Sequence, residues 1–256
     1  MKNRIDLINC PIDCITTKET IEIIDQSINN KKELHHVVVN AAKVVNMQHD
    51  SELRDSVVNC DIINADGQAV VWASRFLGKP LPERVAGIDL MESLVKLAFE
   101  KNYKVFFFGA KEDVVREVVN RYSQQYSPDI IGGYRNGYYS PEEEEGIAKV
   151  IADSGAQILF VAISSPKKEI YLNKYKEIIN IPFIMGVGGS FDVVSGKVPR
   201  APLWMQNAGL EWFYRFLQEP KRMWRRYLYT NSAFIYIVLK EKIKQLMSKS
   251  KDLDLG

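Results

Sequence analysis

The sequence places an acidic and a basic side chain at the ends of two predicted elements, where they could do chemistry. Asp66 follows an apolar run and precedes Gly67, and Arg84 stands further along the chain, just before Val85. A carboxylate at the carboxyl end of a strand lies where open α/β sheets bind their ligands. The same two residue types are also common as a turn residue and as a surface ion-pair partner. Residue type and spacing therefore indicate a small site and leave the structural interpretation open.

Two strand-to-helix turns contain small residues that let backbone N–H groups approach a ligand. One includes Gly109, and the other runs from Gly186 to Ser190 and includes Gly188. Backbone N–H groups at a helix N-terminus favour phosphate binding. Neither turn is a GxGxxG or P-loop motif, and a single glycine turn is often only structural. Several such turns on one sheet edge nevertheless favour nucleotide binding.

The C-terminal quarter of the chain concentrates arginines and aromatic side chains. Arg215, Arg222, Arg225 and Arg226 are spaced so that a helix would bring them to one side, and we expect Pro220 to break that helix after the first of them. The interleaved aromatic residues are Trp212, Phe213, Phe216, Trp224, Tyr227 and Tyr229. Such a segment could lie at a membrane surface or hold a diphosphate through its guanidinium groups. A solvated basic face over an aromatic core is the structural alternative.

Charge is distributed unevenly along the chain. The formal net charge is +2, which does not suggest a nucleic-acid partner. Between Lys197 and Lys251, however, there are twelve Lys or Arg and three Glu. We therefore expect the C-terminal quarter to meet an anionic partner.

Apolar strands alternate with helices along the first three quarters of the chain. This alternation predicts an α/β fold, a Rossmann-like, mainly parallel sheet with helices on both faces. The predicted strands cover residues 5–8, 36–39, 61–64, 104–108, 129–131, 157–163 and 181–187. The predicted helices cover residues 17–28, 41–48, 68–76, 89–101, 113–126, 141–154 and a segment starting at 167, and residues 132–139 are expected to form a loop. We assign residues 1–196 to a catalytic domain and residues 197–256 to a helical appendage.

The remaining composition favours a cytoplasmic protein. Three cysteines, Cys10, Cys14 and Cys60, do not form a disulfide framework or a zinc motif, and the pair His35-His36 is better explained by a structural role than by metal binding. The N-terminus does not resemble a signal peptide, and no apolar run approaches the roughly 20 residues of a membrane-spanning helix. Any membrane contact is therefore expected to be peripheral.

Five sequence motifs together resemble those of a known enzyme family. In order, they are NADG, LPERVAGIDL, SSPKKE, MGVGGSFDVVSGKVPRAP and GLEWFYRFLQEPKRMWRRY. The chain closely resembles the bacterial WecG/TagA/CpsF glycosyltransferases, glycosyltransferase family 26, over roughly residues 5–229. The resemblance implies that the carboxyl edge of the sheet binds a UDP-sugar. It also implies that Asp66 is the general base, that Asn40 positions a sugar, and that Arg84 contacts phosphate or sugar.

The resemblance implies further substrate contacts. Gly109 and the loop from Gly186 to Asp192, which includes Gly188, would lie near the nucleotide, and Asp192 could accept hydrogen bonds from ribose hydroxyls. A helix cap or turn partner is the alternative role for Asp192. No DxD stands at a strand end, so we expect metal independence, with no cofactor and with cationic side chains at the leaving diphosphate.

Two departures from the family pattern concern the substrate. Val38 replaces a threonine, and Lys168 replaces a glutamine that the family is expected to direct at the substrate. Lysine adds charge and cannot accept a hydrogen bond, which leaves the donor sugar open. Arg215, Arg222 and Arg225 match appendage arginines that the family is proposed to bring into the active site at the membrane, where Glu211 could pair with one of them.

These observations predict an inverting, metal-independent glycosyltransferase. It would transfer an N-acetylmannosamine-type or related sugar from UDP to a polyprenyl-diphosphate-linked sugar, at the inner face of the bacterial cell membrane, for cell-surface polysaccharide synthesis. Homo-oligomerisation stays open. The alternatives are a nucleotide-binding oxidoreductase with a Rossmann-like sheet and a non-catalytic membrane-associated scaffold. The missing dinucleotide fingerprint argues against the first, and Asp66 and Arg84 argue against the second.

Overall fold

The computed structural model describes residues 3–164 and 167–253. In this part of the chain, six strands form one sheet in the order β4-β3-β8-β7-β5-β6, and all of its strand pairs are parallel. The strands are β3 (Leu34–Val39), β4 (Ile62–Ala65), β5 (Val105–Gly109), β6 (Ile131–Arg135), β7 (Ile158–Ala162) and β8 (Phe183–Gly186). The predicted Rossmann-like α/β fold is confirmed.

The central strands are apolar throughout because both faces of the sheet are covered. Every residue of β5, which reads VFFFG, is buried, and so are the first four residues of β7. The helices around the sheet are α1 (Thr17–Asn29), α2 (Ala41–Met47), α3 (Ser51–Val58), α4 (Gln68–Phe76), α5 (Gly87–Lys101), α6 (Glu112–Gln125), α7 (Glu144–Asp153), α8 (Lys167–Ile179) and α9 (Ser190–Val194).

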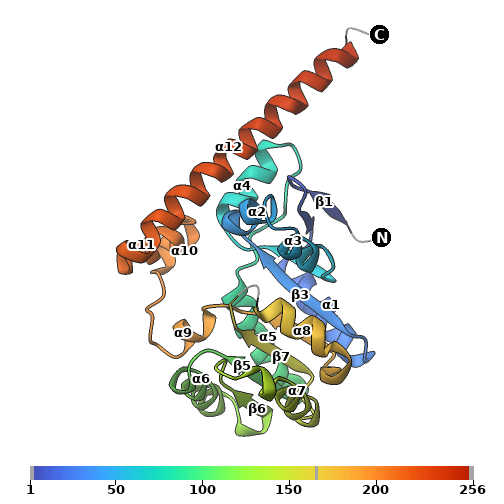
Figure 1. The fold of residues 1–256 in the computed structure, drawn as a ribbon, viewed down its shortest axis with the longest axis vertical. Helices are drawn as coiled ribbons and strands as arrows, with labels where there is room; N and C mark the ends of the chain where they lie inside the picture. Colours follow the sequence, from blue (N-terminus) through green and yellow to red (C-terminus); the bar gives the residue numbers. More distant parts are fainter. Residues whose placement is uncertain (1–2, 165–166, 254–256) are drawn as a thin grey trace.

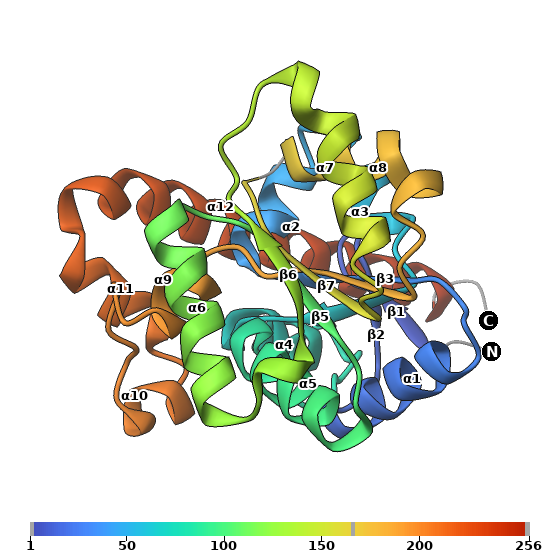
Figure 2. The same ribbon diagram turned by 90° about the horizontal axis from the view of Figure 1, so that it is seen from below.

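Alternate side chains of the strands enter separate core clusters on the two faces. Phe107, Phe160 and Met185 pack with α1, α5, α6 and α9 on one face. Val37 and Val39 pack with α2 and α3 on the other face, where α7 and α8 cover β5, β7 and β8. Figure 2 shows the two helical layers on opposite sides of the sheet. The neighbouring strands β3 and β8 are thus followed by helices on opposite faces, the arrangement that opens a ligand crevice at the carboxyl edge.

The first predicted strand is shorter than expected and belongs to a separate hairpin. β1 (Arg4–Asp6) pairs antiparallel with β2 (Pro11–Asp13). Ile8 and Asn9 have φ values of 59° and 57°, so the chain turns where residues 5–8 were predicted to be extended. Asp13 accepts hydrogen bonds from Arg4 and from the backbone N–H of Ile63 in β4. The hairpin is therefore fixed to the outer strand of the sheet.

Two other predictions of secondary structure were wrong or incomplete. The segment predicted as a strand at 129–131 begins as a 3₁₀ turn, Pro128–Ile130, and β6 covers residues predicted as a loop. Gly133, at φ 151°, allows this because a Cβ atom there would lie 2.7 Å from the Phe106 ring. Helix α3 has no counterpart in the prediction. Its N-cap is Asp50, whose side chain accepts from the backbone N–H of Leu53.

Residues after α9 form three helices beside the sheet (Figure 1). These are α10 (Leu203–Asn207), α11 (Glu211–Gln218) and α12 (Pro220–Leu253), so Pro220 starts a new helix as predicted. Helix α12 packs across α2 and contributes the buried side chains of Phe234 and Val238 to the same core cluster as Val44. Its far end extends away from the body. None of the described helices is long and apolar enough to cross a membrane.

The cysteines are not cross-linked. Cys10, Cys14 and Cys60 are all free thiols, in agreement with the prediction. Burial raises the pKa of Cys10 to about 12 and that of Cys60 to about 11. These two thiols are therefore protonated and poor nucleophiles near neutral pH.

Candidate active site

Asp66 lies where β4 ends at the carboxyl edge of the sheet. Its backbone N–H donates to the carbonyl of Val39 at 2.8 Å, which holds it beside the end of β3. Gly67 follows with φ 135°, a conformation that glycine adopts readily and other residues rarely do. The N–H of Val85 donates to the carbonyl of Ala65 at 2.9 Å, which brings the loop carrying Arg84 alongside. The structure therefore brings together Asp66, Asn40 and Arg84, three of the predicted residues.

The environment of Asp66 raises its basicity. Burial is the main cause of a rise in its pKa to about 6, and Glu211 raises it further, whereas Arg84, Lys43 and the backbone N–H of Gly87 oppose the rise. The residue as a whole is half-buried at the sheet edge, and its carboxyl group is the more enclosed part, since burial dominates its pKa. A carboxylate with a pKa nearer to neutrality is a better general base than an ordinary aspartate.

Asn40 has a structural role at the same place. It is the N-cap of α2, and its Oδ1 accepts from the backbone N–H of Lys43 at 3.0 Å. This satisfies one of the free N–H groups of the first helical turn. The cap orients the side-chain amide at the end of β3, so Asn40 can present its Nδ2–H donors to a ligand.

Arg84 is bound by a residue of the C-terminal helices. Its Nη1 donates to Oε2 of Glu211 at 2.5 Å, and Glu211 Oε1 lies 3.6 Å from Nε of Arg200. Arg200 in turn donates to Oδ1 of Asp89 in α5 at 2.5 Å. Glu211 thus pairs with Arg84 and Arg200. The expected pairing with an appendage arginine falls partly on Arg222 and Arg225, whose side chains lie outside the described residues. The fold places Glu211 over the loop between α4 and α5, which carries Arg84.

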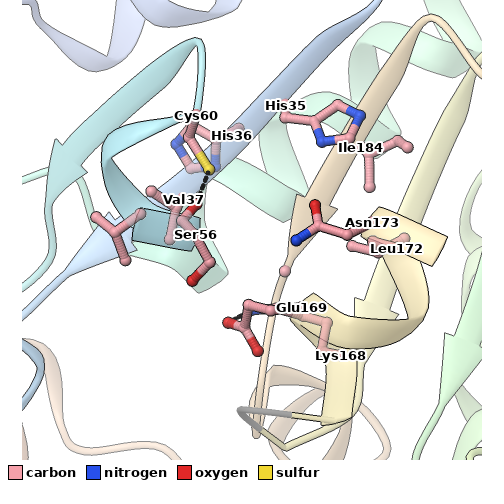
Figure 3. A pocket seen from close by; sticks show the side chains of 12 residues that line it. His35, His36, Val37, Ser56, Cys60, Lys168, Glu169, Leu172, Asn173 and Ile184 are labelled. Atoms are coloured by element: carbon pink, nitrogen blue, oxygen red, sulfur yellow. Dashed lines mark hydrogen bonds and ion pairs between the residues drawn. The ribbon is translucent and has the colours of Figure 1, made fainter. Parts of the chain in front are cut away.

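Lys168 lies at the first turn of α8, across the sheet edge from Asp66. Its Nζ is 3.0 Å from Oε1 of Glu169, and it packs so closely on Gly186 that a Cβ atom there would lie 2.6 Å from Nζ. The two side chains line a small cavity between α3 and α8 (Figure 3). The other oxygen of Glu169, Oε2, is buried without a hydrogen-bond partner among the described residues.

Lys43 connects these two parts of the edge and was missed by the sequence analysis. Burial, and then Lys168, lower its pKa to about 8, against the opposing effects of Glu169, Cys60 and Asp66. Its ammonium group therefore lies within electrostatic reach of both Asp66 and Lys168. The only signal in the sequence is its place three residues after the strand-end Asn40, which does not single out a lysine.

The two predicted glycine turns have clear structural reasons. Gly109 has φ 125°, and a Cβ atom there would lie 2.5 Å from the carbonyl of Ala162 in β7. Four strand spacings separate β5 from β4 in the sheet, so Gly109 is about 19 Å along the edge from Asp66.

Gly188 has φ 53° in the turn after β8. Asp192 is in the first turn of α9, where its backbone carbonyl accepts from the N–H of Val198.

Arg215 is one of the described appendage arginines that lie at the edge. Its guanidinium packs against Gly189, where a Cβ atom would lie 2.7 Å from Nη2. Its Nε is buried without a hydrogen-bond partner among the described residues. Arg222 and Arg225 are in the first turns of α12, and their side chains lie outside the described part of the structure.

Histidines and carboxylates do not gather into a metal site in the described residues. His36 is buried, its Nε2 is 2.9 Å from Oδ1 of Asn64, and burial lowers its pKa to about 4. His35 Nε2 is 2.7 Å from a carboxylate oxygen of Glu33. Both histidines have the structural roles predicted for them.

Comparison with known proteins identifies the family. The sequence profile of the glycosyl transferase WecG/TagA/CpsF family matches residues 5–248. The chain belongs to this family. The match spans both the sheet and most of the C-terminal helices.

Two relatives of this family member carry the same description. An N-acetylglucosaminyldiphosphoundecaprenol N-acetyl-beta-D-mannosaminyltransferase of Bacillus spizizenii is 40% identical over 184 residues, which is 72% of this chain and 70% of the relative. A protein of the same description from Bacillus subtilis is 35% identical over 205 residues, or 80% of this chain and 79% of the relative. The chain is a glycosyltransferase, which decides against the oxidoreductase and scaffold alternatives.

Proposed function

We propose that this glycosyltransferase moves an N-acetylmannosamine-type sugar from UDP to a polyprenyl-diphosphate-linked N-acetylglucosamine in the synthesis of a cell-surface polymer. The names of the two relatives support the acceptor and the transferred sugar. The observation that carries the proposal is Asp66, a carboxylate of raised pKa at the carboxyl edge of a Rossmann-like sheet, with Arg84 beside it.

The proposed reaction is a single displacement with inversion. The acceptor hydroxyl oxygen attacks the anomeric carbon, its proton passes to the Asp66 carboxylate, and the bond from that carbon to the β-phosphate oxygen breaks. The electron pair leaves with UDP. A positioned base of suitable pKa contributes about 10²–10⁴-fold to such a step.

Cationic side chains at the same edge are suited to the departing diphosphate. Three of them are described at this edge: Arg84 in the α4–α5 loop, Lys43 in α2 and Arg215 in α11. Preorganised cations at the place where charge develops can take the role that a metal ion has in other transferases. We therefore propose a metal-independent reaction, in which EDTA leaves the rate unchanged and strong inhibition by EDTA would contradict the proposal.

The C-terminal helices are proposed to form a membrane-contacting appendage of the catalytic body, over residues 197–256. Helix α12 exposes Leu228, Tyr229 and Tyr236 on one side, with exposed fractions of 64%, 61% and 65%. Basic residues accompany these apolar side chains along the helix, a composition that suits an interface with anionic lipids. The acceptor, a lipid diphosphate, would be met at the inner face of the bacterial membrane.

The experiment is a transfer assay with a short-chain polyprenyl-diphosphate N-acetylglucosamine and a panel of UDP-sugars. We expect the UDP-N-acetylmannosamine reaction to give a disaccharide on the lipid diphosphate. The panel includes acidic sugars, because the Lys168 ammonium stands where the family is expected to have a neutral glutamine. Transfer only from an unrelated sugar nucleotide would overturn the proposed donor. No transfer to any lipid diphosphate would overturn the proposed acceptor.

A further inference from the structure

The C-terminal helices reach the catalytic edge of the sheet through a chain of ion pairs. Glu211, the first residue of α11, binds Arg84 at 2.5 Å and approaches Arg200 at 3.6 Å, and Arg200 binds Asp89 of α5. Glu211 and Arg84 are sheltered, with side-chain exposures of 27% and 16%. Ion pairs in such partly desolvated positions are screened less by salt than surface pairs.

These pairs hold the Glu211 carboxylate within electrostatic reach of Asp66, the group that would accept the proton. Three charged side chains act on Asp66: Arg84 from the loop before α5, Lys43 from α2 and Glu211 from α11. The first two favour the ionised carboxylate, and Glu211 is the one that opposes it. By neutralising Arg84, Glu211 also weakens the largest of the stabilising charges.

We propose that Glu211 is a positioning residue for the transfer reaction, which holds Arg84 at the catalytic edge and ties it to Arg200 when the C-terminal helices are docked on the sheet. This inference rests on the proposed function, because it assumes that Asp66 accepts a proton. Without Glu211, Asp66 would face an unneutralised Arg84 and would hold its negative charge more firmly. Docking of the C-terminal helices and the strength of the base would then be coupled through one side chain.

The first test measures Asp66 directly and requires no substrate. In full-length protein carrying ¹³C-labelled aspartate, the carboxyl resonance of Asp66 is assigned by its loss in Asp66→Asn and titrated with pH. We expect the midpoint to move to lower pH in Glu211→Gln and to stay near the wild-type value in Glu211→Asp, which keeps the charge. Glu177→Gln makes the same change at an exposed site on α8 and should leave the midpoint unchanged. An unaltered midpoint in folded Glu211→Gln would overturn the proposal.

The second test uses the reaction. The acid limb of the kcat/KM profile should shift to lower pH in Glu211→Gln by the same interval as the resonance of Asp66, because both report one carboxyl group. A merely structural role would lower the rate at every pH without moving the limb, and that result would contradict the proposal. If the wild-type protein transfers no sugar, the proposed function fails, while the titration still decides whether Glu211 acts on Asp66.

Discussion

At the scale of single residues, Asp66 has the most clearly defined of the proposed roles. We expect Asp66→Asn to lower kcat by about 10²–10⁴-fold, because the amide cannot accept the proton of the acceptor hydroxyl. Thermal unfolding is the control. The pKa of Asp66 is higher in the folded protein than its ordinary value, so the ionised carboxylate opposes folding above about pH 6 and the neutral amide should not reduce stability there. Near-wild-type turnover of the folded variant would remove Asp66 from the mechanism.

The pH dependence of the wild-type enzyme follows from the same group. A base must be ionised to act, and the pKa of Asp66 is raised to about 6. We therefore expect kcat/KM to fall about tenfold per pH unit below this value, as measured in initial-rate assays across pH 4.5–8 in constant ionic strength. A profile that stays flat down to about pH 4.5 would mean that an ordinary aspartate, or another group, accepts the proton.

How far the sequence predicted the site depended on where each partner lies along the chain. Asp66 and Arg84 were recognisable because both stand at element boundaries within one short stretch. The Glu211–Arg84 pair joins residues 127 positions apart and depends on how α11 docks, which no local pattern encodes. Lys43 was missed for a similar reason, since its effect on Asp66 depends on α2 lying over the end of β4.

At the scale of elements, the sheet was predictable because β5, β7 and β8 are continuous apolar runs between helices. The prediction failed at β6, where a strand contains two glycines. Glycine is a poor local signal for a strand. Glycine is needed at position 133 because the Phe106 ring occupies the space that a side chain there would need.

A matched pair of glycine substitutions tests the close contact of β5 with β7. Gly109→Ala should destabilise the protein by about 2 kcal/mol or more, because it strains a positive φ and its Cβ would collide with the Ala162 carbonyl. Gly146→Ala, in helix α7 with open space around it, should stabilise by about 0.5–1 kcal/mol. Urea unfolding measures both. Equal effects at the two positions would show that the tight approach of β7 to Gly109 is not a constraint.

At the scale of the whole molecule, α12 belongs to two environments. Phe234 and Val238 are buried in the core cluster that also contains Val44 of α2, while the opposite side of the helix is exposed and apolar. We therefore expect the sheet and the C-terminal helices to unfold together. Removing the whole appendage would expose part of the core, so substitutions on its exposed side are the cleaner test of membrane binding.

The double substitution Leu228→Glu and Tyr236→Glu should weaken binding to anionic phospholipid vesicles by about tenfold or more, since each removes apolar area from the lipid contact. Co-sedimentation with vesicles measures the change. Val150→Glu places the same charge on an exposed apolar position of α7 and should leave binding unchanged. If the double variant binds as the wild type does, the exposed side of α12 is not the lipid-contacting surface, and its role in contact between copies of the chain should be examined by gel filtration.

The hairpin at the N-terminus has a consequence for how the protein behaves in solution. β4 is one of the two edge strands of the sheet, and an open edge strand is a template for pairing with other chains. Asp13 accepts a hydrogen bond from the backbone N–H of Ile63, and Arg4 donates hydrogen bonds to the carbonyls of Cys60 and Asp61. We therefore expect these few residues to limit aggregation, so that removal of residues 1–13 would reduce solubility before it reduced catalysis.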